Sequence, residues 1–360
     1  MAEFSADIER RDVVEGWRAI TDRGGCPGVF SCLPWVAAWA AAFADRLVPE
    51  IGLAGDSGSI QGILPLFRRD DGLLTTPVNF VSHRGELVCL PGREQEVAAS
   101  ILRSARSRGE TLLMRGLPAG SGTDRAVRGV ASPSGYIAVE REGRSSPVVD
   151  VAGDWESYYE GRPRKVTHEW ERKIRKLDRA GEVTVHVYDG GDTDELVTAF
   201  ADLEDGSWKD DTGTSIRGRG MESFYRDVSR RLDEAGWFRP WWVELDGRMI
   251  AFLYGVELGG TYYALKTSYL KRVAKLSPGV RLFRDAVRDV FERGLDRFDF
   301  VGQPARWKDE WANDRLEHSD LTLYPDDASG RARALVEGRI KPAARAVRDS
   351  VSGRGGDGRS

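Results

Sequence analysis

Three strand-like runs follow one another between residues 241 and 270, joined by turns of two residues each. The runs are Trp241–Leu245, Met249–Leu258 and Thr261–Leu270, and the turns are Asp246-Gly247 and Gly259-Gly260. Both turns carry residues that tolerate the positive φ angles of tight hairpins. The pattern therefore predicts an antiparallel meander and excludes an all-helical fold for this part of the chain.

A helix with clear ends follows the meander. Ser277 is suited to cap it, Pro278 fits its first turn, and Gly294 suits its end. Its inward stripe has helical spacing and consists of Val280, Phe283, Val287, Val290 and Phe291. After the glycine, Phe298–Val301 predicts a short buried strand.

Further helices and strands are predicted on both sides of a polar stretch that ends at Pro147. After this stretch we expect strands at Val148–Val151 and Val183–Tyr188 and helices from near Asp192 and over Met221–Ala235. Before it we expect helices at Leu33–Ala44 and Gln95–Arg108, strands at Ile51–Ala54, Ile60–Phe67 and Thr111–Met114, and a loop at Gly120–Gly135.

The 360 residues suit two domains. We place them at 1–147 and 148–325, followed by a partly helical to disordered tail at 326–360. The predicted fold class is α+β (mixed α/β), with a mostly antiparallel central sheet flanked by helices in each domain.

Composition excludes several classes of function. The formal charge of −4 argues against a protein whose whole surface binds nucleic acid. Three cysteines and four scattered histidines have no metal-ligand spacing, so we expect buried thiols and no metal site. The sequence has no apolar run long enough for a membrane span and no secretory signal pattern, which predicts a cytoplasmic protein.

The order of elements and several motifs resemble the GNAT acyltransferases, specifically the CelD-like acetyltransferase family, a relative of the Fem peptidyltransferases. The motifs are IAFLYG at 250–255, YYALKTSYL at 262–270, LSPG at 276–279 and FDFVGQPARWKDEW at 298–311, with LPWVAAW at 33–39 and GILPLF at 62–67 in the first half. The resemblance spans about residues 29–324 and implies tandem GNAT-like domains, with the acyltransferase site in the second.

The resemblance also implies a donor, acetyl-CoA or another acyl-CoA, whose diphosphate meets the start of the helix at Ser277. The expected donor-binding residues are Lys271, Arg272, Lys275, Ser277 and Gly279. However, VAKLSPG keeps only the final glycine of the usual GNAT phosphate loop. Two alternatives therefore stay open: a Fem-like transferase that uses aminoacyl-tRNA, and a GNAT-fold binding protein without catalysis.

Acyl transfer to an amine or hydroxyl needs proton transfer and stabilisation of a developing negative charge. Asp299 is the candidate base or acceptor anchor, Tyr269 the candidate proton donor to a leaving thiolate, and Lys308 the candidate holder of an anionic group. A structural ion pair is the alternative for Asp299 and Lys308. The expected substrate-binding residues are Trp208, Lys266, Gln303 and Trp311, although tryptophans at such positions also form core.

A basic helix is predicted over 164–179. Its apolar stripe is narrow, and the remaining face carries Arg164, Lys165, Arg172, Lys173, Arg175, Lys176 and Arg179. This face is a candidate site for an anionic ligand, or for tRNA under the Fem-like alternative, while a solvated helix surface is the simpler interpretation. The acyl acceptor is expected to be a small molecule, a sugar or a cell-envelope precursor.

Overall fold

The computed structural model describes residues 2–56 and 59–340. Its contacts divide the chain into two compact units. Among the described residues, the first contains 2–25, 46–143 and 318–340, and the second contains 26–45 and 144–317. The junction at 143 lies close to the predicted boundary at 147, but each unit is discontinuous, whereas the sequence predicted continuous domains.

The second unit is built on a mixed sheet of seven strands. The strands are β10 (Ser146–Asp150), β11 (Val183–Val187), β12 (Trp241–Leu245), β13 (Arg248–Leu258), β14 (Thr261–Tyr269), β15 (Arg297–Asp299) and β16 (Asp314–Leu316). They are ordered β11-β12-β13-β14-β15-β10-β16, and every neighbouring pair is antiparallel except β14 with β15. The predicted meander is therefore confirmed.

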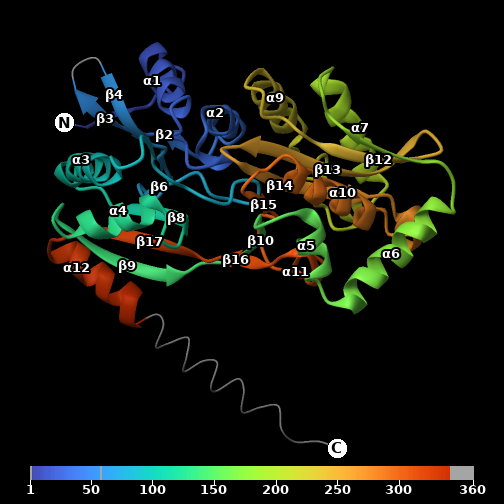
Figure 1. Cartoon of the computed structure of the whole chain (residues 1–360). Coiled ribbons are helices and arrows are strands. Elements are labelled where there is room, and N and C mark those ends of the chain that lie inside the picture. The colour runs from blue at the N-terminus through green and yellow to red at the C-terminus, as the bar shows by residue number, and fades with distance from the viewer. Residues whose placement is uncertain (1, 57–58, 341–360) are drawn as a thin grey trace, which may run out of the picture. The chain divides into compact units, whose positions relative to one another are not determined.

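Helices cover both faces of this sheet. They are α2 (Leu33–Ala42), α5 (Trp155–Glu160), α6 (Arg164–Asp178), α7 (Thr193–Asp205), α8 (Trp208–Asp211), α9 (Glu222–Glu234), α10 (Pro278–Glu292) and α11 (Arg306–Trp311), with 3₁₀ turns at η1 (Val29–Ser31) and η2 (Lys271–Leu276). Figure 1 shows α7 and α9 on one side of the sheet and α10 on the other.

Side chains of β13 show why both faces are covered. Phe252 stacks on Phe200 of α7, with ring centroids 4.3 Å apart, and the Tyr254 hydroxyl shares a 2.8 Å hydrogen bond with Ser229 of α9. Leu253 points the other way, into the core formed with α10. A strand buried on both faces reads as a continuous apolar run, as 250–256 does.

The first unit is also mixed α/β, as predicted, but its strands form two sheets. One has the order β1-β3-β4-β7 and the other β2-β5-β6-β8-β17-β9. The strands are β1 (Glu3–Ser5), β2 (Val48–Pro49), β3 (Ile51–Asp56), β4 (Ser59–Leu64), β5 (Phe67–Arg68), β6 (Leu74–Thr75), β7 (Val88–Cys89), β8 (Leu112–Pro118), β9 (Tyr136–Glu142) and β17 (His318–Pro325). The helices are α1 (Arg11–Thr21), α3 (Glu94–Ser107), α4 (Gly122–Ala131) and α12 (Ala328–Leu335), the last followed by a π-helical turn at Val336–Ile340.

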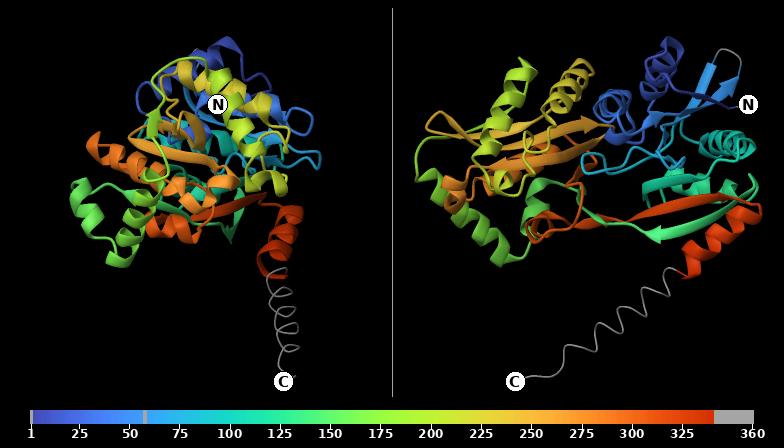
Figure 2. Two further views of the ribbon diagram at one scale, coloured as in Figure 1. Left: turned by 90° about the vertical axis from the view of Figure 1, so that its right-hand side faces the viewer. Right: turned by 180° about the vertical axis from the view of Figure 1, so that it is seen from behind.

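Two segments explain the discontinuity of the units. Helix α2 is apolar on nearly all sides and packs on α9 of the second unit. Strand β17 pairs with both β8 and β9 and so completes a sheet of the first unit, with α12 packed beside it (Figure 2). The sequence pattern of a strand does not show which distant strand it pairs with. The assignment of α2 to the second unit and of β17 to the first was therefore not predicted.

One predicted loop is wrong. Within Gly120–Gly135 the chain forms α4, because the Ser121 side chain accepts a hydrogen bond from the Asp124 backbone N–H and caps the helix. Val127 and Ala131 then face the core. The last twenty residues of the predicted tail lie outside the described part of the chain.

Candidate functional site

The two parallel strands of the second unit separate near their ends. Residues of β14 and β15 are paired from Thr261↔Arg297 to Tyr263↔Asp299, where β15 ends. Strand β14 continues to Tyr269, while the chain after β15 turns away through Val301 and Gly302, which both have positive φ. The second half of β14 therefore lacks a partner strand on this side.

A cavity of about 410 Å³ lies beside this half of β14. Its volume is in the range of pockets that bind small ligands and cofactors. Its walls come from α6, Trp208, the end of β14, η2, the start of α10, and α11. The lining residues are Trp170, Lys173, Trp208, Thr267, Ser268, Tyr269, Ala274, Ser277, Gly279, Val280, Phe283, Trp307, Glu310 and Trp311.

Aromatic rings dominate the walls of the cavity. Trp170 and Trp311 are buried and stack with centroids 3.5 Å apart and an interplanar angle of 8°. Trp307 packs against Phe283 of α10 at 4.9 Å. Such walls favour an apolar portion of a ligand, with Lys173 and Glu310 as the charged groups of the lining.

The N-terminus of α10 also faces the cavity. Ser277 precedes the helix in a left-handed conformation (φ 54°, ψ 50°), so it occupies the predicted cap position without the predicted capping hydrogen bond. A Cβ placed on Gly279 would meet no atom within 4 Å, so the backbone there is open to a ligand. Unpaired N–H groups and the helix dipole favour an anion at this end.

The other expected donor-binding residues lie on η2, outside the cavity lining. Lys271, Arg272 and Lys275 are exposed. The Lys271 ammonium pairs with Asp211 at 2.6 Å, and the backbone oxygen of Lys275 accepts a hydrogen bond from Lys176. These three lysine and arginine side chains thus add positive charge around the site without lining it.

The expected catalytic residues separate into two groups. Tyr269 lines the cavity. Asp299 is completely buried, does not line the cavity, and accepts a 2.8 Å hydrogen bond from the backbone N–H of Val301. Lys308 donates to the backbone oxygens of Val301 and Gln303. Asp299 and Lys308 therefore both hold the turn that follows β15.

The environment of Lys308 lowers the pKa of its ammonium group. Burial lowers the pKa of this ammonium to about 8, although the negative charge of Asp299 acts in the opposite direction. Lys308 thus carries a proton that is easier to lose than that of an exposed lysine.

The expected substrate-binding residues are also divided. Trp208 and Trp311 line the cavity, whereas Gln303 is exposed and its amide faces the Arg144 guanidinium. Lys266 points to the opposite face of the sheet, where it pairs with Glu204 of α7 at 3.2 Å. Glu204 was not predicted, because an acidic residue within an amphipathic helix has no distinguishing sequence signal.

The basic helix α6 has partners for several of its charges. Arg172 and Lys173 pair with Glu169 at 2.7 and 3.5 Å, and Arg175 pairs with Glu171 at 3.9 Å. Because neighbours three and four residues apart commonly pair on a helix, this arrangement fits a solvated surface. Lys173 additionally lines the cavity, a role that its sequence pattern did not reveal.

Part of the second unit matches a known protein family. Residues 164–309 match the family model described as an acetyltransferase (GNAT) domain. This matched segment lies in the second unit and contains all of the cavity-lining residues except Glu310 and Trp311. No curated protein matches the chain with significant sequence similarity.

Solved structures resemble the chain over both units. FemX has a TM-score of 0.62 at 12% identity, covering 89% of this chain and 98% of its own. The C-terminal domain of a protein named as a lysylphosphatidylglycerol synthetase, from Agrobacterium fabrum, has a TM-score of 0.55 at 11% identity. The match covers 91% of this chain and 96% of that domain. L-PGS from Bacillus licheniformis has a TM-score of 0.52 at 12% identity, covering 84% of this chain and 95% of its own. At these identities the likeness is one of fold.

Among residues 2–56 and 59–340, no helix combines the length and apolar character that crossing a bilayer requires. In the same part of the chain, no three histidine, cysteine, aspartate or glutamate side chains are grouped so that they could hold a metal ion.

Proposed function

We propose that the chain is an acyltransferase of the CelD-like branch of the GNAT proteins. It transfers an acyl group, acetyl in the simplest case, from coenzyme A to an amine or hydroxyl of a small molecule, a sugar or a cell-envelope precursor. The observation that carries this proposal is the cavity beside the separated end of β14, which joins the N-terminus of α10 to an aromatic chamber containing Tyr269.

Each part of the cavity has a role in this proposal. The open backbone at Gly279 and the α10 dipole bind the donor diphosphate. The tryptophan walls enclose the apolar arm of the donor. The acceptor attacks the thioester carbonyl, the C–S bond breaks, and the Tyr269 hydroxyl protonates the leaving thiolate. The proton lost by the acceptor passes to water, and water returns a proton to the Tyr269 phenolate. Asp299 and Lys308 are positioning residues that fix the turn after β15.

The second candidate is transfer from aminoacyl-tRNA. Two observations favour it: the overall fold is similar to FemX and to a lysylphosphatidylglycerol synthetase domain, and the basic helix α6 borders the cavity through Lys173. The incomplete phosphate loop, VAKLSPG, also weakens the specific case for coenzyme A. The same cavity would then hold an aminoacyl group instead of a thioester arm.

Binding of the two donor classes to the full chain separates these candidates. We expect acetyl-CoA to bind, and charged tRNA to bind no better than uncharged tRNA. A protein that recognises tRNA through many phosphate contacts would instead lose affinity steeply as salt is raised. Binding of charged tRNA in preference to uncharged tRNA, together with no binding of acetyl-CoA, would replace the first proposal by the second.

A further inference from the structure

A nearly buried cluster of charges lies on the α7 face of β14, opposite the cavity. Glu204 of α7 is fully buried and contacts two ammonium groups, Lys209 of α8 at 2.8 Å and Lys266 of β14 at 3.2 Å. Each lysine side chain is only 12% exposed. The remaining carboxylate contact is a 2.7 Å hydrogen bond from the backbone N–H of Ile216.

The two lysines carry more positive charge than Glu204 neutralises and more N–H donors than the neighbouring acceptors can pair with. Two ammoniums face one carboxylate, so the fully ionised cluster has a net charge of about +1. Lys266 also donates to the backbone oxygen of Thr214 at 3.5 Å. Of the six ammonium N–H groups of the two lysines, roughly three have no acceptor within the described part of the chain. Buried donors of this kind are normally paired with an acceptor.

The titratable groups around the Lys266 ammonium are Lys209, Glu204 and Tyr225. Burial lowers the pKa of Lys266 to about 8, and the positive charge of Lys209 lowers it further, while Glu204 opposes both. Tyr225 of α9 presents its ring 5.7 Å from the Lys266 ammonium, and burial keeps the hydroxyl of this tyrosine un-ionised. Within residues 2–56 and 59–340, Glu204 is the one carboxylate that pairs with these two lysines.

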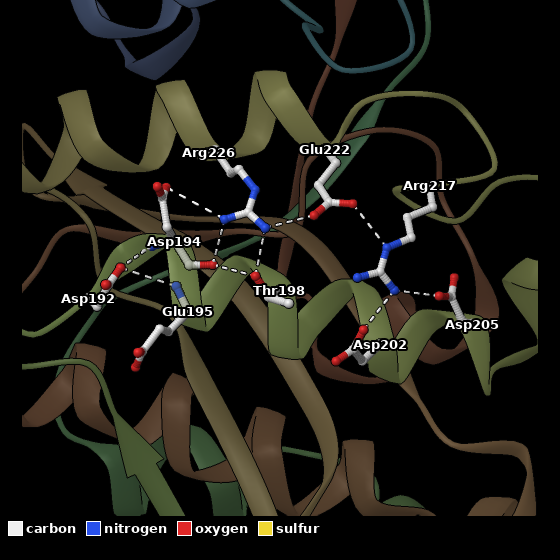
Figure 3. Close-up of polar contacts among 9 residues, drawn as sticks. All are labelled: Asp192, Asp194, Glu195, Thr198, Asp202, Asp205, Arg217, Glu222 and Arg226. Carbon is white, nitrogen blue, oxygen red and sulfur yellow. Dashed lines mark hydrogen bonds and ion pairs between the residues drawn. The ribbon is translucent and has the colours of Figure 1, made fainter.

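Polar contacts of Arg217 and Arg226, drawn in Figure 3, link α7 and α9, two of the helices that surround the cluster. Arg217, in the loop after α8, pairs with Asp202 and Asp205 of α7 and with Glu222 of α9. Arg226 of α9 bonds both Glu222 and Thr198 of α7. The loop that supplies Thr214 and Ile216 is therefore fixed against α7 and α9, and the two lysines lie in a preorganised frame.

The cluster adjoins the cavity along two elements. Lys209 follows Trp208, and Lys266 precedes Thr267, and both of these neighbours line the cavity. A molecule bound at the lysines would thus lie close to the donor enclosed on the other side of β14.

We propose that Lys209 and Lys266, positioned by Glu204, bind an anionic group of the acyl acceptor, a carboxylate or a phosphate. The assignment to the acceptor rests on the proposed acyltransferase function, whereas the anion site itself does not. The anion would accept hydrogen bonds from the unsatisfied ammonium N–H groups and neutralise the surplus charge.

Calorimetric titration of the full chain with inorganic phosphate and, separately, with sodium acetate tests the site. We expect at least one of these anions to bind, and the tighter of the two identifies the acidic group of the acceptor. Lys266→Met and Lys209→Met should each weaken binding by about 10- to 100-fold, whereas Lys266→Arg should retain most of it. Arg230→Met removes an exposed positive charge from the same unit and is the matched control.

Titration with sulfate at several pH values adds a second readout, because sulfate keeps its charge over this range. The affinity for sulfate should fall as the pH rises from about 7 to about 9.5, because Lys266 loses its proton within this range. The Lys266→Met variant should show a smaller fall.

Three outcomes would overturn the anion site: no binding of either anion, equal phosphate affinity in the lysine variants and in Arg230→Met, or a flat sulfate profile. Melting temperatures identify variants that fail to fold, and the two lysine positions provide independent tests. Because acetyl-CoA binding is measured separately, its loss would reject the proposed donor without affecting the result for the anion site.

Discussion

Replacing Tyr269 with phenylalanine is expected to lower the turnover of acyl transfer by about 10²- to 10⁴-fold, the usual contribution of a general acid. Tyr269 lines the cavity at the end of β14. No group in the described part of the chain shares a hydrogen bond with its hydroxyl, so removing it leaves no buried partner unsatisfied. Donor affinity and melting temperature should therefore change little.

Steady-state kinetics with the donor and calorimetry of its binding check this expectation. Tyr188→Phe is the matched control, because it removes a hydroxyl that donates to the backbone oxygen of Gly191, away from the cavity. Unchanged turnover in Tyr269→Phe would remove this residue from the chemistry. A parallel loss of turnover and stability would instead indicate a structural role.

Replacing Trp311 with alanine is expected to reduce the free energy of unfolding by about 3–5 kcal/mol, the typical cost of truncating a buried large aromatic side chain. Trp311 is 2% exposed and stacks on Trp170, which is itself buried, so the two rings cannot close the space left behind without rearrangement. The cavity should also lose one of its walls.

Denaturant unfolding measures this effect. Trp208→Ala is the control, because Trp208 also lines the cavity but is 48% exposed, and its loss should cost less than about 1 kcal/mol. Equal stability losses in the two variants would contradict the conclusion that the stacked Trp170–Trp311 pair forms a buried wall of the cavity.

The sequence allowed much of the second unit to be predicted, because its signals are local. Turn residues at 246–247 and 259–260 identify the meander, and Pro278 marks the start of α10. The exchange of α2 and β17 between the units depends on contacts across more than a hundred residues, and such contacts leave no periodic pattern in either segment.

Lys266 was predicted to bind the substrate, but its side chain lies on the face of the sheet opposite the cavity. Tyr262 and Ala264 face the α10 core, and strict alternation along β14 would place Lys266 on the same side. However, the register with β13 shifts between Tyr254↔Lys266 and Gly255↔Ala264, which leaves Leu265 as an extra residue. This bulge turns Lys266 toward Glu204, while Tyr269 still reaches the cavity.

Asp299 and Gln303 were placed by their closeness in sequence to the expected site. Alternation correctly separates Asp299 from its phenylalanine neighbours, but it cannot show whether the opposite side is open or buried. In the structure the turn after β15 closes over Asp299, and Lys308 fixes that turn. Burial of this kind depends on the path of a loop, which residue types do not specify.

Calorimetry with acetyl-CoA on Gly279→Leu tests whether the cavity of the second unit binds the acyl donor. A Cβ added at Gly279 meets no atom within 4 Å outside the adjoining helix backbone, and the cavity lies beside it, so we expect the leucine to be accommodated without loss of melting temperature while it fills the donor space. We expect the unaltered chain to bind acetyl-CoA and the variant to bind it at least about tenfold more weakly. Gly129→Leu, at a helical position of the first unit where an added Cβ meets only the Gln95 side chain at 3.6 Å, should bind as the unaltered chain does. Equal affinity in Gly279→Leu and the unaltered chain, or no binding by the unaltered chain, would contradict the account.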